Sequence, residues 1–293
     1  MNARLPKHPR VVILGPPNRT AVQSEASRVQ ARIRDTAEVV AVDLEFKFDF
    51  DTELGRTVDL VLVVGGDGSI LQAARQMGKH QRPVLGINCG RLGFLAAVSP
   101  EEFLEHWPRI AQGHHRIVDH LMLDTTLIRD GEIVTSHLLL NEVAVLGGPP
   151  YRILEMDLYS DDLLATRYRC DGLIVSTPIG STAHNLSAGG PILRRSLQAI
   201  VISPISPHTL TYRPLVDSAD AELELRIVEC NESTGWVVDG RMLSSLKPGD
   251  QIRIRRADIN FQMVVTEHHN DYRALREKLG WGGSVPVRRS SLS

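Results

Sequence analysis

One stretch, LVLVVGGDGSILQAAR at residues 60–75, joins a strand pattern to a helix pattern through a glycine-rich turn. Its first five residues are all apolar, and the turn residues Gly65-Gly66-Asp67-Gly68-Ser69 follow directly. A strand this uniformly apolar is typical of a parallel sheet covered by helices on both faces. The sequence therefore predicts a buried strand that delivers a charged residue, Asp67, to the point where a helix begins.

The same alternation of short apolar strands and helices extends over residues 1–116. The predicted strands are Arg10–Leu14, Glu38–Leu44, Asp59–Val64 and Pro83–Asn88. Between the first two, apolar residues recur at helical spacing from Val22 to Ile33. We predict an N-terminal α/β domain with a parallel sheet over residues 1–116.

From residue 117 the apolar residues recur with period two, as in AELELRIV at 221–228. Further strand patterns are Leu121–Ile128, Ser136–Leu146, Arg152–Ser160 and Leu173–Val175, and a hairpin turn is expected near Ala257-Asp258. These patterns predict a mainly antiparallel, sandwich-like C-terminal domain over residues 117–267. The segment 268–281 is expected to form a helix that packs back on the N-terminal domain, and the tail 282–293 is expected to be disordered.

Composition excludes several classes of function for the 293 residues. A net charge of −2 gives no broad basic surface, so we expect no nucleic-acid partner. Apolar runs are too short for a membrane helix, and the N-terminus resembles no secretory signal. Cys89, Cys170 and Cys230 are widely spaced, which favours free thiols in the cytoplasm over disulfides or a zinc site.

The glycine turn has the chemistry of a phosphate site. Glycines let backbone N–H groups approach a ligand closely, and Ser69 is expected to cap a helix whose N-terminus favours an anion. Because Asp67 would repel a phosphate, it is better explained as a general base beside a hydroxyl or as a contact to phosphate-bound Mg²⁺. The alternative is a tight turn in which Asp67 is only a local cap. A P-loop is excluded, since no GxxxxGK pattern is present.

Two other stretches are candidates for ligand binding. RCDGLIVSTPIGSTAHNLSAGGPIL, at 169–193, contains many small hydroxyl residues around a short predicted helix at Ser181–Ser187, which suits recognition of a sugar or a base edge. The alternative is a long polar connection. Asn141-Glu142 interrupts an apolar run, so at least one of the two residues should face inward or line a cleft, unless a bulge or a strand end lies there.

The remaining candidates are weaker. Arg91 lies near the end of the fourth predicted strand, where ligands of parallel sheets bind. His184, His208 and Asp239 are chemically capable but more often structural. The pairs His114-His115 and His268-His269 lack acidic or thiol partners at ligand spacing, so no metal site is predicted.

Taken together, the motifs resemble those of the bacterial-type NAD kinases over roughly 60–281. They are GGDGS at 65–69, GINCGRLGFL at 86–95, NE at 141–142, DGLIVSTPIGSTAHNLSAGGPI at 171–192, PHTL at 207–210 and LREKLGW at 275–281. The motif at 171–192 is by far the most specific. Short GGDG turns also occur in lipid kinases and phosphofructokinases.

The resemblance implies Mg²⁺-dependent transfer of the γ-phosphoryl group of ATP to the 2′-hydroxyl of the adenosine ribose of NAD, giving NADP. Asp67 would be the base, with Gly66 and Gly68 close to the sugar and phosphates. The implied NAD-binding residues also include Asn141, Glu142, Asp171, Thr182, Ala183, His184 and Ser187. Those implied on the ATP and phosphate side are Gly65, Ser69, Asn88 and Arg91. A homodimer or homotetramer is implied, with the site completed across subunits.

The sequence departs from the usual family pattern at four positions: Cys89, Ile179, His184 and Arg241. Cys89 and Arg241 affect the phosphate side, and Ile179 and His184 affect the expected adenine pocket. Two alternatives therefore stay open. One is a lipid or sugar kinase of the same superfamily, and the other is a nucleotide-binding regulator without catalytic activity.

Overall fold

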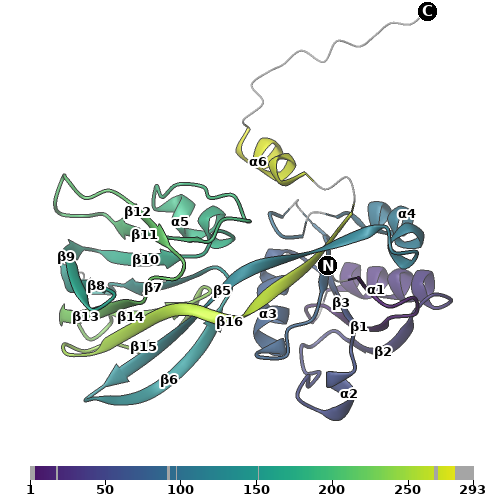
Figure 1. The fold of residues 1–293 in the computed structure, drawn as a ribbon, viewed down its shortest axis with the longest axis horizontal. Helices are drawn as coiled ribbons and strands as arrows, with labels where there is room; N and C mark the ends of the chain where they lie inside the picture. Colours follow the sequence, from purple (N-terminus) through teal and green to yellow (C-terminus); the bar gives the residue numbers. More distant parts are fainter. Residues whose placement is uncertain are drawn as a thin grey trace, which may run out of the picture.

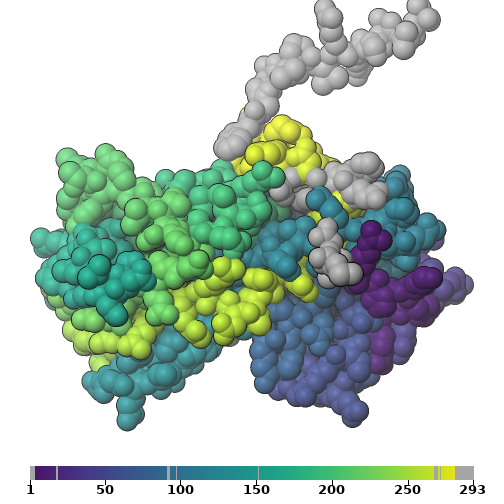
Figure 2. All heavy atoms as spheres, in the orientation of Figure 1, coloured from purple at the N-terminus to yellow at the C-terminus, as the bar shows by residue number. Residues whose placement is uncertain are grey.

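The computed structural model describes residues 4–17, 19–90, 93–96, 98–150, 152–266 and 270–280. The helical segments are α1 (Thr20–Ile33), α2 (Glu53–Arg56), α3 (Asp67–Met77), α4 (Pro100–Ala111), the 3₁₀ turn η1 (Gly180–Thr182), α5 (His184–Ser187) and α6 (Asp271–Leu279). The strands are β1 (Arg10–Leu14), β2 (Glu38–Asp43), β3 (Leu60–Val64), β4 (Val84–Ile87), β5 (His115–Arg129), β6 (Glu132–Leu139), β7 (Glu142–Leu146), β8 (Leu154–Ser160), β9 (Leu163–Cys170), β10 (Gly172–Ser176), β11 (Ala199–Ile205), β12 (Leu215–Ser218), β13 (Leu223–Glu229), β14 (Gly235–Val238), β15 (Arg241–Ser245) and β16 (Gln251–Thr266). Figures 1 and 2 show them as two lobes side by side.

The N-terminal lobe is built on parallel strands in the order β2-β1-β3-β4. Alternate residues of β3 enter two different apolar clusters. Val61 and Val63 face α3, whereas Leu60 and Leu62 face α1 and α4. The central strand β3 is therefore covered on both faces, which is why its sequence is apolar at every position, whereas the edge strand β2 carries charged residues at both ends.

The C-terminal lobe is a sandwich of antiparallel strands. One layer contains β5, β6, β8, β9, β13 and part of β16, and the other has the order β12-β11-β10-β7-β14-β15. Their facing side chains form one cluster that includes Leu158 and Leu225 from the first layer and Val175 and Trp236 from the second. The predicted fold class is confirmed by this arrangement and by the structural neighbours described below.

The long strands β5 and β16 run through both lobes (Figure 1). β16 pairs with β13 at Ile254 and Leu223, and farther along it pairs in parallel with β4 at Met263 and Val84. A single strand thus joins the parallel and antiparallel parts into a ten-stranded sheet. The proposed domain boundary after residue 116 falls at the start of β5.

Two sequence predictions about strands were wrong. No hairpin turn exists at Ala257-Asp258, because β16 continues through these residues with a bulge between Arg256 and Asn260. The bulge interrupts the period of two in the same way as a turn would. The run 136–146 is not one strand but the end of β6 and the whole of β7, which belong to different sheets.

The C-terminal helix α6 contacts the N-terminal lobe. Arg273 forms an ion pair with Glu102 of α4 at 2.8 Å, and the Lys278 ammonium lies 4.2 Å from the centre of the Phe94 ring. Within the described ranges, no helix combines the length and the apolar character needed to cross a membrane. His268, His269 and the tail 282–293 lie outside the described residues.

Candidate functional site

The glycine turn leads from β3 directly into α3, which begins at Asp67 with Gly66 as its N-cap. The prediction that Ser69 caps this helix was wrong, because the helix starts two residues earlier. Ser69 is buried within the first turn, and its backbone N–H donates to the Gly66 carbonyl oxygen at 2.9 Å. A Cβ at Gly65 would lie 2.3 Å from the Ser69 hydroxyl, whereas a Cβ at Gly66 or Gly68 would meet nothing within 4 Å. Gly65 is thus required by packing, and open space lies beside the other two.

Asp67 holds the segment 93–96 that follows β4. Its Oδ2 accepts a hydrogen bond from the Phe94 N–H at 2.7 Å, and its Oδ1 accepts from the N–H groups of Leu95 and Ala96 at 2.9 Å each. A Cβ at Gly93 would approach Asp67 Oδ1 to 2.0 Å, so only glycine allows this contact. These three bonds leave part of the acceptor capacity of the carboxylate for another partner, since two oxygens offer about four lone-pair positions.

Asn141 and Glu142 lie where β7 begins, and both are buried. The carboxylate of Asp239, in the turn between β14 and β15, accepts hydrogen bonds from the N–H groups of Leu140, Asn141 and Glu142 at 3.0, 2.7 and 3.2 Å. Asp239 has a positive φ of 45°, which is uncommon for a residue with a side chain. Asn141 and Glu142 therefore lie at a strand end, which was the alternative predicted for them, and the Asp239 carboxylate holds the backbone of this strand end in place.

Glu142 carries an unusual carboxyl group. Burial, reinforced by the nearby Asp239 charge, raises its pKa from 4.5 to about 8, although the backbone N–H of His184 partly opposes the shift. Its Oε2 atom is buried and has no hydrogen-bond partner among the described residues. Burial also raises the pKa of Asp239, although three N–H donors oppose this. An unpartnered buried oxygen is costly, so this position suits a polar ligand group.

The loop that follows β10 is held by its own hydroxyl groups. The Thr177 hydroxyl donates to the Leu140 carbonyl oxygen at 2.6 Å, and that of Ser181 donates to the Pro178 carbonyl oxygen at 2.6 Å. Ser176, Thr177 and Ser181 are fully buried, so the hydroxyl groups of these three residues hold the loop together from inside. The four predicted site residues in this loop are all at least partly accessible to solvent: Thr182, Ala183, His184 and Ser187.

Asn185 holds the same loop from inside, although sequence reasoning gave it no role. Its amide nitrogen donates to the carbonyl oxygens of Ser181 and Pro191, at 3.1 Å each, and its Oδ1 accepts from the Ser203 hydroxyl at 2.7 Å. Ile179 is also buried, in the apolar cluster that covers α3. The departure at Ile179 therefore affects packing rather than an exposed pocket wall.

The other predicted site residues occupy different places. Asp171 precedes β10 and lies at the opposite end of this strand from Glu142, because Gly172 pairs with Leu146 and Ser176 pairs with Glu142. Its carboxylate faces His208 at 3.3 Å. Asn88 is buried after β4, where its Oδ1 accepts from the Gly90 N–H. Arg91 lies outside the described residues.

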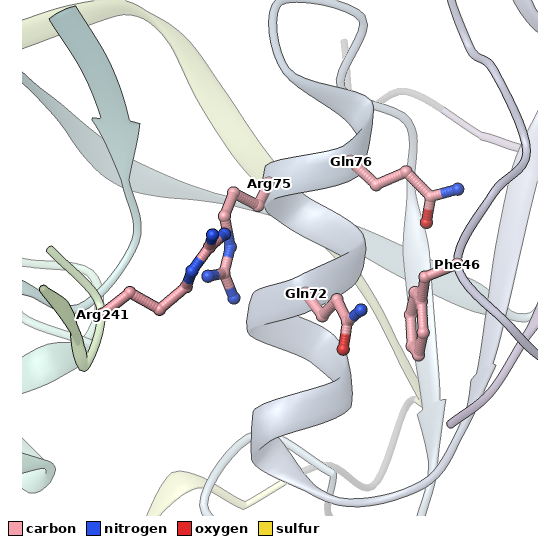
Figure 3. Close-up of a pocket in the computed structure, with 5 residues that line it drawn as sticks. All are labelled: Phe46, Gln72, Arg75, Gln76 and Arg241. Carbon is pink, nitrogen blue, oxygen red and sulfur yellow. The ribbon is translucent and has the colours of Figure 1, made fainter. Parts of the chain in front are cut away.

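Alongside α3 lies a cavity of about 570 Å³ lined by Phe46, Gln72, Arg75, Gln76 and Arg241. Figure 3 shows Arg75 and Arg241 reaching toward one another on one side of α3, with Phe46 and Gln76 on its other side and Gln72 between. Arg75 comes from α3 and Arg241 begins β15 directly after Asp239-Gly240. The N-terminal and C-terminal lobes thus meet at this cavity.

Comparison with known protein families identifies the family of this chain. Residues 15–115 match the ATP-NAD kinase N-terminal domain, and residues 140–266 match the ATP-NAD kinase C-terminal domain. The chain belongs to the NAD kinase family. An NAD kinase from Rhodopirellula baltica is 62% identical over 96% of this chain and 89% of its own length. One from Teredinibacter turnerae is 42% identical over 78% of both chains.

Solved NAD kinase structures resemble this one. The structure of an NAD kinase from Archaeoglobus fulgidus in complex with ATP has a TM-score of 0.73 at 27% identity, covering 92% of this chain and 97% of that one. The yeast NADH kinase complexed with NADH has a TM-score of 0.85 at 22% identity, covering 96% of this chain and 90% of that one. Because the identity to the yeast protein is only 22%, this comparison supports a shared fold and nothing more.

Proposed function

We propose that this protein is an NAD kinase, which transfers the γ-phosphoryl group of ATP to the 2′-hydroxyl of the adenosine ribose of NAD. The observation that carries the proposal is the placement of Asp67 at the N-terminus of α3, beside open space at Gly66 and Gly68. This is the position at which a hydroxyl and a phosphoryl group can meet, because helix N-terminal N–H groups bind phosphate oxygens.

In this mechanism Asp67 accepts the proton of the ribose 2′-hydroxyl, and the ribose 2′-oxygen attacks the γ-phosphorus of ATP. The new bond joins the ribose oxygen to phosphorus, and the bond from phosphorus to the bridging oxygen of ADP breaks, so that ADP leaves. The contacts from Phe94, Leu95 and Ala96 hold the Asp67 carboxylate in one orientation for this step. Mg²⁺ arrives with ATP and neutralises charge on the phosphates.

Glu142 and Asn141 bind the adenosine half of NAD in this proposal. With a pKa of about 8, the Glu142 carboxyl group is largely protonated at neutral pH and can donate a hydrogen bond to a ribose oxygen. Thr182, Ala183 and His184, which follow in the adjacent loop, would contact the adenine, with Ser187 at the outer edge. On the phosphate side, Gly65 and Ser69 shape the turn, and Asn88 follows β4. We assign Arg91, which is outside the described residues, to the same side from the sequence alone.

Asp171 and Glu142 lie at opposite ends of β10, which is five residues or about 16 Å long. We propose that a homodimer or homotetramer brings Asp171 of one copy to the site of another. The free thiols of Cys89, Cys170 and Cys230 suit a reducing compartment, so we place the reaction in the cytoplasm.

The test is an assay with ATP, Mg²⁺ and NAD, in which NADP is detected with an NADP-specific dehydrogenase. NADP formation by the wild-type protein establishes the reaction. If folded protein binds NAD yet forms no NADP, the protein is a regulator and the proposal fails. Phosphorylation of a lipid or sugar in preference to NAD, in a parallel substrate panel, identifies the other kinase class instead.

A further inference from the structure

The cavity beside α3 brings two positive charges together. Arg75 and Arg241 extend toward one another from different lobes (Figure 3), and neither forms an ion pair within the part of the chain that the structure describes. The Nε atom of Arg75 is buried and has no hydrogen-bond partner there. Two guanidinium groups that face each other repel, and an unsatisfied buried donor costs free energy. An anion bound between them removes both costs.

The electrostatic surroundings support the same conclusion. Burial and the nearby Arg241 charge lower the pKa of Arg75, and the Asp239 charge offsets this only in part. The carboxylate of Asp239 is already occupied by the N–H groups of residues 140–142. It therefore contributes charge to the cavity without forming a direct bond to either arginine.

The cavity lies along the helix face that begins at the site of phosphoryl transfer. Gly68, Gln72 and Gln76 are spaced by four residues on α3, so they lie on one face of the helix. The Gly68 end of this face is open, and the Gln72 and Gln76 end lines the cavity. From Gly68 to Arg75 the helix rises about 10–12 Å, which leaves room for a chain of phosphates along it.

We infer that Arg75 and Arg241 bind the phosphate chain of the phosphoryl donor, whose terminal phosphoryl group lies at the N-terminus of α3. This inference rests on the proposed NAD kinase function. Guanidinium groups bind phosphate oxygens through paired N–H donors, and the Gln72 amide supplies a further donor. The shared ligand chemistry is a linear polyphosphate, present both in ATP and in inorganic polyphosphate. The arginines come from α3 and β15, so donor binding also joins the two lobes.

The test uses Arg75→Gln, Arg241→Gln and the double variant, with Arg34→Gln as a control. Arg34 follows α1 and its side chain is 74% exposed, so the control removes the same charge away from the cavity. We expect KM for ATP to rise about 10–100-fold in each cavity variant, the usual effect of losing a charged hydrogen bond. KM for NAD should change by less than about threefold, and the control should match the wild type. Assays with inorganic polyphosphate in place of ATP show which of the two donors the site accepts.

A second measurement separates the inference from the proposed function. Calorimetry with tripolyphosphate alone needs no turnover, and we expect binding by the wild type that is lost in the double variant. If this holds while no NADP is formed, the polyphosphate site stands and the proposed function fails. An increase in KM for NAD with an unchanged KM for ATP would assign the cavity to the acceptor and overturn the inference. Unchanged constants together with unchanged tripolyphosphate binding would overturn it as well.

Discussion

Asp67 is both the proposed base and a structural anchor, so Asp67→Asn should change stability as well as turnover. An Asn side chain with its oxygen at the Oδ1 position keeps the contacts to Leu95 and Ala96 without their charge. Its NH₂ group then faces the Phe94 N–H, so that two donors meet where a 2.7 Å hydrogen bond existed. Losing one charged bond and weakening two others costs about 2–4 kcal/mol.

This loss corresponds to a decrease in Tm of roughly 5–15 °C, at about 2–4 °C per kcal/mol for a protein of this size class. Turnover should decrease about 10²–10⁴-fold, the usual contribution of a general base. Differential scanning calorimetry gives Tm, and the NADP assay gives kcat at a temperature well below the Tm of the variant.

Asp250→Asn is the matched control. Asp250 is a fully buried anchor at the β15–β16 turn, where it accepts hydrogen bonds from Arg129 and from the Lys247 N–H. The control should lose stability but keep its turnover within about threefold when assayed below its Tm, since it touches no site residue. If Asp67→Asn behaves like Asp250→Asn, Asp67 is an anchor and not a base. If Asp67→Asn leaves Tm unchanged, the reasoning from the three N–H contacts is refuted.

Three further predictions concern the C-terminal part of the site. Folding raises the pKa of Glu142 from 4.5 to about 8, so the folded state binds a proton more tightly than the unfolded state. The free energy of unfolding should therefore decrease by a few kcal/mol as pH rises between these two values. Urea unfolding at pH 5 and pH 9 measures this decrease, which should be absent in Glu142→Gln. Asn141→Ala keeps the backbone contacts to Asp239 and should weaken NAD binding about tenfold by calorimetry, whereas an unchanged Kd would place the adenosine elsewhere. Asn185→Ala removes the hydrogen-bond partner of the Ser203 hydroxyl and of two carbonyl oxygens, so the free energy of unfolding should decrease by about 2–4 kcal/mol. Hydrogen exchange over residues 181–191 should also become faster, and unchanged exchange would contradict this.

The N-terminal fold was predictable because its determinants are local. The inner strands of the parallel sheet, β1, β3 and β4, are covered on both faces, and this leaves short apolar runs in the sequence. The glycine turn at 65–69 follows such a run, so Asp67 could be placed at a strand end before any contact was known. The bulge at Arg256–Asn260 could not be told from a turn, because both interrupt a period of two.

The contacts that complete the site depend on residues distant in sequence. Asp239 holds residues 140–142, and Arg241 meets Arg75 of α3, only because β14 pairs with β7. The Asp-Gly pair at 239–240 does indicate a tight turn, which was the one available signal for this region. Nothing in the sequence tells which backbone groups such a turn will meet. For the same reason, the hydroxyl groups of Ser176, Thr177 and Ser181 suggested ligand contacts, although folding directs them inward.

The strands β5 and β16 also determine how the protein responds to force and to truncation. Family comparisons divide the chain into two segments, but β16 carries hydrogen bonds to both β13 and β4 along one uninterrupted backbone. The bulge at Arg256–Asn260 lies between these two pairings, so bending of one lobe relative to the other is expected to concentrate there. Removing the second segment would take β16 away from β4 and expose the edge of β4. Removal of either segment is therefore expected to destabilise the other, because β16 is shared by both lobes.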